Sequence, residues 1–240
     1  MARRPRAFVP GVPVHLIQRG NNRNACFFQN CDYIVYLEKL SEYAKQFDVA
    51  VHSYVLMTNH VHLLATPMAQ KSVSKLMHSL GAYYVHYINT RYQRTGTLWE
   101  GRYKDCLVDS ERYFLTVSRY IELNPVRANM CRNPAEYRWS SFRHLAAGVP
   151  NSIISPHLLY LALGSTESER QECYRHLFLE HISELTLQDI RDACNKSWTL
   201  GDNQFKRQIE SRLGYALPPY PRGRPGNSTT LEKSDQSKCP

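Results

Sequence analysis

The sequence lacks a hydrophobic run of about 18 residues, the length that a bilayer-spanning helix needs. No apolar segment follows the basic residues near Met1, so we expect no signal peptide. The seven cysteines are an odd number without a Cys-x-x-Cys pair, which argues against a disulfide framework and against a zinc knuckle. We therefore expect a cytoplasmic protein without a membrane partner.

Acidic side chains are scarce relative to basic ones. The 240 residues include 21 Asp and Glu against 30 Lys and Arg, which gives a net charge of +9. The excess lies in residues 1–150, with 19 basic and 10 acidic groups, whereas residues 151–215 carry 7 and 9. This asymmetry favours nucleic acid as the partner of the first 150 residues, and simple solubility is the alternative.

The composition is otherwise globular, with 42% hydrophobic and 11% aromatic residues, which excludes a collagen, a coiled coil and a fully disordered chain. Apolar spacing predicts strands at 12–19, 51–57, 60–66 and 103–108, and helices that begin near Asp32, Ser72 and Asp109 or Ser110. The order β-α-β-β-α-β-α indicates an α+β fold with a mainly antiparallel sheet and helices on one face. We expect one domain at 1–150, a small all-helical module at 151–215 and a disordered basic tail at 216–240.

Two histidines share one face of the predicted strand 60–66. His60 and His62 are two residues apart, so their side chains project from the same face about 6.5–7 Å apart, while Val61 points into the core. Neutral histidine is a common metal ligand at pH 7, and two imidazoles at this spacing can bind one cation. A structural zinc site needs four ligands, so an open site completed by oxygen ligands is the better interpretation. The alternative is two unrelated histidines on a sheet.

A tyrosine and an asparagine share one face of the helix that Pro125 ends. Tyr120 and Asn124 are four residues apart, so a phenol and an amide oxygen can reach the same place. Each has a structural alternative. Tyr120 also falls on an apolar stripe with Tyr113, which is typical of core packing. Asn124 directly precedes Pro125, as a residue that ends a helix often does.

Three segments occur in a fixed order and together carry a family resemblance: Thr58-Asn59-His60-Val61-His62-Leu63-Leu64, Leu98-Trp99-Glu100-Gly101-Arg102-Tyr103-Lys104 and Arg119-Tyr120-Ile121-Glu122-Leu123-Asn124-Pro125-Val126-Arg127-Ala128. They resemble the single-tyrosine HUH transposases, and more narrowly the REP-associated tyrosine transposases. The resemblance covers residues 8–147, and residues 151–240 fall outside it.

The resemblance implies a ferredoxin-like domain that cuts and rejoins DNA. His60 and His62 match the HUH pair and would hold a divalent metal, Mg²⁺ or Mn²⁺. Tyr120 matches the nucleophile, and Asn124 matches the position of a third metal ligand. The implied activity is that of a metal-dependent single-stranded DNA endonuclease and strand transferase, which acts on REP-like hairpin DNA through a 5′-phosphotyrosine intermediate. The alternative is a regulator that binds DNA or RNA hairpins on the same fold without catalysis.

Other basic and aromatic residues are candidates for DNA contact. One aromatic–basic cluster suits base stacking and phosphate binding, although Trp99 can equally be core: Trp99, Arg102, Tyr103 and Lys104. Arg3, Arg4 and Arg6 form a predicted mobile arm, Arg23 lies in an early turn, and Arg222 and Arg224 match the core of an AT-hook. A solvated surface or tail is the alternative for each. We expect a nucleoid-associated monomer or homodimer.

Overall fold

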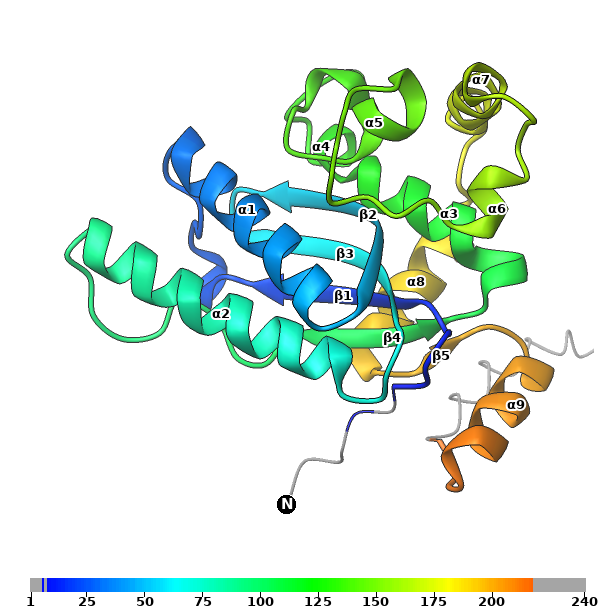
Figure 1. The fold of residues 1–240 in the computed structure, drawn as a ribbon, viewed down its shortest axis with the longest axis horizontal. Coiled ribbons are helices and arrows are strands. Elements are labelled where there is room, and N and C mark those ends of the chain that lie inside the picture. The colour runs from blue at the N-terminus through cyan, green and yellow to red at the C-terminus, as the bar shows by residue number, and fades with distance from the viewer. Residues whose placement is uncertain (1–5, 7, 218–240) are drawn as a thin grey trace, which may run out of the picture.

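The computed structural model describes residue 6 and residues 8–217. A five-stranded sheet runs through it in the order β2-β3-β1-β4-β5 (Figure 1). The strands are β1 (Val14–Arg19), β2 (Val49–Met57), β3 (His60–Pro67), β4 (Lys104–Val108) and β5 (Thr199–Leu200). Neighbouring strands are antiparallel except β4 and β5, which are parallel.

Helices connect and cover these strands. In the described residues the α-helices are α1 (Asn30–Gln46), α2 (Ser72–Arg91), α3 (Ser110–Glu122), α4 (Asn124–Arg127), α5 (Phe142–Ala147), α6 (Leu158–Leu161), α7 (Glu167–Leu177), α8 (Glu184–Lys196) and α9 (Asn203–Leu213). Short 3-10 helices span Asn21–Arg23 and Pro134–Glu136. None of these helices has both the length and the apolar character to span a bilayer.

The predicted order of elements and the α+β class with a mainly antiparallel sheet are confirmed. The β1-α1-β2-β3-α2-β4 connectivity with sheet order β2-β3-β1-β4 is the ferredoxin-like arrangement. Asp109 is the N-cap of α3, and its carboxylate accepts a hydrogen bond from the Glu111 backbone N–H. Asp32 instead lies inside α1, where it forms a capping box with the N-cap residue Gln29.

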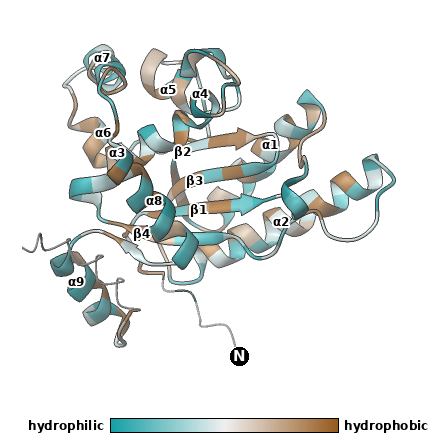
Figure 2. Cartoon of the chain, turned by 180° about the vertical axis from the view of Figure 1, so that it is seen from behind, coloured by the Kyte–Doolittle hydropathy of each residue, from teal (hydrophilic) through white to brown (hydrophobic). Residues whose placement is uncertain are grey.

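Helices cover both faces of the sheet, so the expectation of helices on one face is wrong. Helices α1 and α2 pack on one face with Leu63 of β3, while α3 and α8 pack on the other with Leu64. Figure 1 looks onto α1 and α2, and Figure 2 looks from behind onto α3 and α8. Strand β3 is buried on both faces because helices cover both sides of the sheet.

The region after residue 150 joins the sheet. Helix α8 packs against β4 and β1, and Thr199 and Leu200 form the strand β5 beside β4. Helices α6 and α7 contact α3 and α5 respectively. The predicted C-terminal helices are present, but this region also supplies one edge strand, so it is not purely helical. The boundary at residue 150 stays a prediction.

A buried carboxyl group ties α3 to its neighbours. Glu122 is fully buried and accepts hydrogen bonds from the Ser141 hydroxyl (2.5 Å) and the Tyr174 hydroxyl (2.9 Å). The Ser118 hydroxyl lies 2.8 Å from the same tyrosine oxygen. Burial raises the pKa of Glu122 to about 8, although the hydrogen bonds from Ser141 and Tyr174 act to lower it. The folded protein therefore holds this carboxyl protonated at neutral pH.

The pH dependence of stability tests this protonation state. Below about pH 4.5 Glu122 is protonated in both the folded and the unfolded chain, and its contribution to stability is fully present. As the pH rises towards 8 the unfolded chain releases the proton first, so the contribution is lost. Between about pH 5 and pH 8 the wild type should lose on the order of 3 kcal/mol of unfolding free energy relative to Glu122→Gln. Urea unfolding at both pH values measures this difference, and parallel pH profiles would contradict it.

Candidate active site

The register of the central strands gathers three histidines on the sheet face that α3 and α8 cover. In the β1–β3 pairing, His60 lies opposite Arg19, His62 opposite Ile17, and His15 opposite Leu64. The rings of His60 and His62 are 5.0 Å apart between centroids, and those of His15 and His62 are 5.1 Å apart. The structure therefore brings the predicted histidine pair together and adds His15.

Hydrogen bonds orient both members of the pair. Nδ1 of His60 lies 2.6 Å from Oδ1 of Asn59, and Nδ1 of His62 lies 2.8 Å from Nε2 of His15. Burial lowers the pKa of His60 to about 4, with a smaller contribution from Arg19, and lowers the pKa of His62 well below its usual range. Both imidazoles are therefore neutral at pH 7, the state in which histidine binds metal.

Tyr120 faces the histidines from α3. Its side chain is buried, and its ring centroid lies 6.0 Å from that of His62 and 5.8 Å from that of His15. The Tyr120 side chain therefore meets the histidine cluster, although it also packs within the apolar core beneath α3. The predicted tyrosine and histidines converge from two separate elements.

Two arginines surround this tyrosine, and the sequence pattern identified neither as a site residue. The guanidinium carbon of Arg127 lies 4.3 Å from the centroid of the Tyr120 ring, and its Nη2 donates to the Tyr120 carbonyl. Burial raises the pKa of Tyr120, while Arg127 and a side-chain hydrogen bond from Arg191 of α8 oppose the rise. A cation close to the phenol favours its ionised form.

Asn124 ends α3. Its side-chain nitrogen donates to the carbonyl oxygens of Tyr120 and Ile121, both at 3.0 Å. The amide group therefore adds a donor to two carbonyls in the last turn of α3, of which the Tyr120 carbonyl also accepts from Arg127. This geometry favours the interpretation of Asn124 as a residue that helps to end a helix. Its role as a metal ligand stays a prediction.

The donor set of the histidines fits a divalent cation. Nδ2 of Asn59 donates to the carbonyl oxygen of Arg23 at 2.9 Å, so Oδ1 of Asn59 is the atom that faces His60. Nδ1 of His60 must then carry a proton, which leaves the lone pair on Nε2. A ligating histidine commonly donates its other ring N–H in this way.

Comparison with known proteins shows a similarity to one family. Residues 8–124 match the family model of the IS200-like transposases. The match covers just under half of the chain and includes His60, His62 and Tyr120. A solved REP-associated tyrosine transposase bound to a REP hairpin has a TM-score of 0.52 and 15% identity, over 66% of this chain and 93% of that one, and therefore shares its fold. A candidate transposase from Deinococcus radiodurans R1 has a TM-score of 0.36 and 20% identity, over 50% and 96% of the two chains. A search of curated proteins finds no match to the sequence.

Three residues of the aromatic–basic cluster line a groove of about 600 Å³ beside α2. Trp99, Arg102 and Tyr103 lie on one wall, and His78 and Gly81 of α2 lie on the other. Trp99 and Tyr103 are buried, whereas the side chain of Arg102 is exposed. Lys104 is also exposed, and its ammonium group donates to Oδ1 of Asn195 at 2.8 Å. Of these four residues, the two aromatic ones therefore lie in the core and the two basic ones lie at the surface.

The remaining basic candidates are dispersed. Arg6 does not lie in a free arm, because its Nε contacts Oδ1 of Asp105 at 2.6 Å and its guanidinium group lies 3.6 Å over the Tyr103 ring. Arg23 is exposed in the turn after β1. Arg3, Arg4, Arg222 and Arg224 fall outside the described residues.

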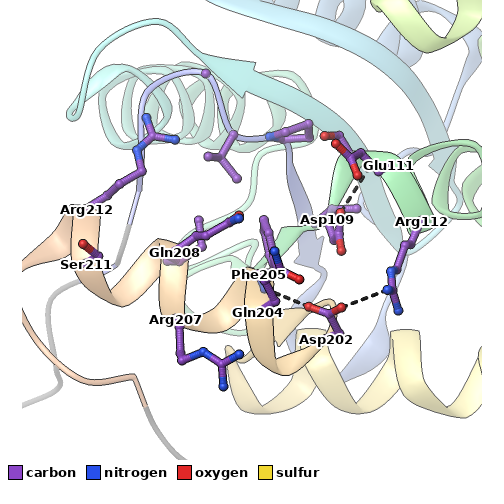
Figure 3. A pocket seen from close by; sticks show the side chains of 16 residues that line it. Asp109, Glu111, Arg112, Asp202, Gln204, Phe205, Arg207, Gln208, Ser211 and Arg212 are labelled. Carbon is purple, nitrogen blue, oxygen red and sulfur yellow. Dashed lines mark hydrogen bonds and ion pairs between the residues drawn. The ribbon is translucent and has the colours of Figure 1, made fainter.

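A charge substitution tests the groove as a DNA contact. Arg102→Ala should weaken binding of single-stranded DNA several-fold and lower the salt dependence of binding by about one phosphate contact. Arg112→Ala is the matched control, because Arg112 pairs with Asp202 at 3.0 Å in another pocket, of about 760 Å³, between α9 and the start of α3 (Figure 3). Fluorescence anisotropy across a salt series measures the DNA affinity and its salt dependence for both variants. Equal losses for the two variants would contradict a specific contact at Arg102.

Proposed function

We propose that this protein is a transposase: a metal-dependent endonuclease and strand transferase that acts on single-stranded, REP-like hairpin DNA. The observation that carries the proposal is the convergence of Tyr120 with the two predicted metal histidines: its ring lies 6.0 Å from that of His62, which lies 5.0 Å from that of His60. A non-catalytic hairpin binder would not need a tyrosine at this place. The REP hairpin bound by the structural relative supports the choice of substrate.

The proposed reaction exchanges one phosphoester for another. The Tyr120 oxygen attacks phosphorus, the new O–P bond forms, and the bond from phosphorus to the 3′ oxygen breaks. The tyrosine hydroxyl loses a proton and the departing 3′ oxygen gains one. The product is a 5′-phosphotyrosine, so the energy of the broken bond is retained and a second 3′-hydroxyl can reverse or redirect the transfer.

The site residues have separate proposed roles in this reaction. His60 and His62 would hold Mg²⁺ or Mn²⁺, which would neutralise the charge that develops on the phosphate oxygens. Arg127 packs on the Tyr120 ring and, together with Arg191, favours the ionised phenol.

The metal role can be tested by removing both ligands. His60→Ala with His62→Ala should reduce DNA cleavage to background while hairpin affinity changes less than about threefold, because phosphate contacts by Lys and Arg dominate affinity. Cleavage of a labelled hairpin with Mn²⁺, with and without EDTA, measures the first effect, and anisotropy measures the second. His86→Ala, an exposed histidine on α2 that does not line the groove, is the control and should cleave normally. Undiminished cleavage by the double variant, or cleavage in EDTA, would contradict the metal role.

The nucleophile can be tested by removing one oxygen. Tyr120→Phe keeps the ring that packs against Arg127, so we expect a change in stability of about 1 kcal/mol or less. The variant should bind hairpin DNA normally and form no SDS-resistant protein–DNA adduct. Tyr113→Phe, on the same helix seven residues earlier, should form the adduct at the wild-type level. An adduct with Tyr120→Phe would show that another residue is the nucleophile.

A further inference from the structure

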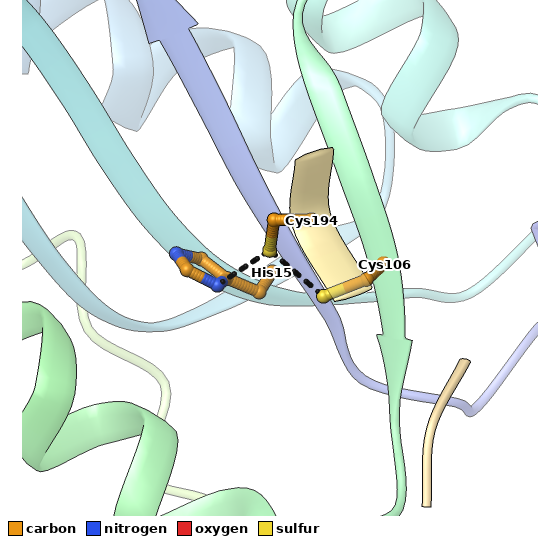
Figure 4. Close-up of side chains that lie close together, drawn as sticks. All are labelled: His15, Cys106 and Cys194. Atoms are coloured by element: carbon orange, nitrogen blue, oxygen red, sulfur yellow. Dashed lines mark hydrogen bonds between the residues drawn. The ribbon is translucent and has the colours of Figure 1, made fainter. Parts of the chain in front are cut away.

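Four buried side chains form a continuous hydrogen-bonded chain that ends at His62, a predicted metal ligand. Figure 4 shows three of them, His15, Cys194 and Cys106. Nδ1 of His62 lies 2.8 Å from Nε2 of His15, and Nδ1 of His15 lies 3.0 Å from Sγ of Cys194. Sγ of Cys194 lies 2.9 Å from Sγ of Cys106. Strands β3, β1 and β4 supply three of these residues, and α8 supplies Cys194.

The protons of such a chain have two possible directions. In the first direction His62 donates from Nδ1 to His15, His15 donates from Nδ1 to Cys194, and Cys194 donates to Cys106. Nε2 of His62 then keeps its lone pair. In the reverse direction each donor becomes an acceptor, and the proton of His62 lies on Nε2. Only the first direction leaves His62 able to bind a cation through Nε2.

We propose that His15, Cys194 and Cys106 are positioning residues that hold His62 as its Nδ1–H tautomer and so reserve Nε2 for the divalent cation. The inference rests on the proposed function, because it takes His62 as a metal ligand. Partners of this kind fix the ring orientation and raise the basicity of a ligating histidine.

The second histidine of the pair supports this direction. Asn59 fixes His60 as the Nδ1–H tautomer, because its own amide nitrogen is engaged by the Arg23 carbonyl. Two neighbouring histidines in the same tautomer offer two Nε2 lone pairs to one cation. The hydrogen-bonded chain from Cys106 to His15 gives the Nδ1–H of His62 an acceptor, as Oδ1 of Asn59 does for the Nδ1–H of His60.

The same cluster is less suited to hold a metal of its own. His15, Cys106 and Cys194 place their ligand atoms within 4.8 Å of one another. The two sulfur atoms are only 2.9 Å apart, whereas two thiolates around zinc stand roughly 3.7 Å apart for bonds of about 2.3 Å. A metal on Nδ1 of His15 would also force a proton onto Nε2 and reverse the chain.

The tautomer can be read directly in the full-length, metal-free protein. Nitrogen-15 NMR of the imidazole side chains at neutral pH should show His62 protonated on Nδ1. This readout does not depend on cleavage, so its failure would be distinct from a failure of the proposed function, which the adduct assay tests. A proton on Nε2 of His62, or stoichiometric zinc bound through His15, would overturn the proposal.

Substitution of Cys194 tests the effect on the metal. Cys194→Ala removes the acceptor for His15, so the dissociation constant for Mn²⁺, measured by electron paramagnetic resonance, should rise about tenfold. Cys194→Ser retains a donor and acceptor and should restore most of the affinity. Cys26→Ala removes a buried cysteine that contacts the Thr58 carbonyl instead and should leave affinity unchanged. Unchanged affinity in a folded Cys194→Ala protein, or equal loss with Cys26→Ala, would overturn the proposal.

Discussion

The antiparallel register of β1 on β3 is the constraint on which the site depends. It places Ile17 opposite His62 and Arg19 opposite His60, and it puts His15 on the same face, two residues before Ile17. Side chains alternate between the faces of a sheet, so a slip of one residue in β1 would move His15 to the α1–α2 face. The apolar residues Val14 and Leu16, buried on that opposite face, oppose such a slip.

Residues far apart in the sequence complete the surroundings of the tyrosine. Helix α3 presents Tyr120 to the histidines, and Arg127 of α4 lies over the Tyr120 ring. Helix α8 adds Arg191 and Cys194. Helix α8 lies beyond residues 8–124, which match the transposase family. The region after residue 150 therefore contributes both packing and polar groups to the candidate site.

Local patterns predicted much of this architecture. The alternation in β1 and β3, the helical spacing in α1, α2 and α3, and the cap at Asp109 all arise from neighbouring residues, and the structure confirms them. The histidine pair was visible for the same reason, since residues two apart in a strand share a face.

What the sequence could not predict depends on contacts over long separations. His15 alternates with Val14 and Leu16, which is typical of a solvent-facing position, yet it is fully buried because α3 and α8 cover that face. Cys106 and Cys194 are separated by 88 positions and meet only when α8 packs on β4. Arg6 was expected in a free arm because no local pattern indicates its ion pair with Asp105.

Mass spectrometry of the protein–DNA adduct tests the central claim most directly. The wild-type protein is incubated with hairpin DNA and Mn²⁺, the adduct is digested with protease and nuclease, and the modified peptide is sequenced. The account predicts a nucleotide linked through its 5′ phosphate to Tyr120, the tyrosine that faces His62. A nucleotide on Tyr113 or Tyr103, or cleavage without any covalent adduct, would contradict it.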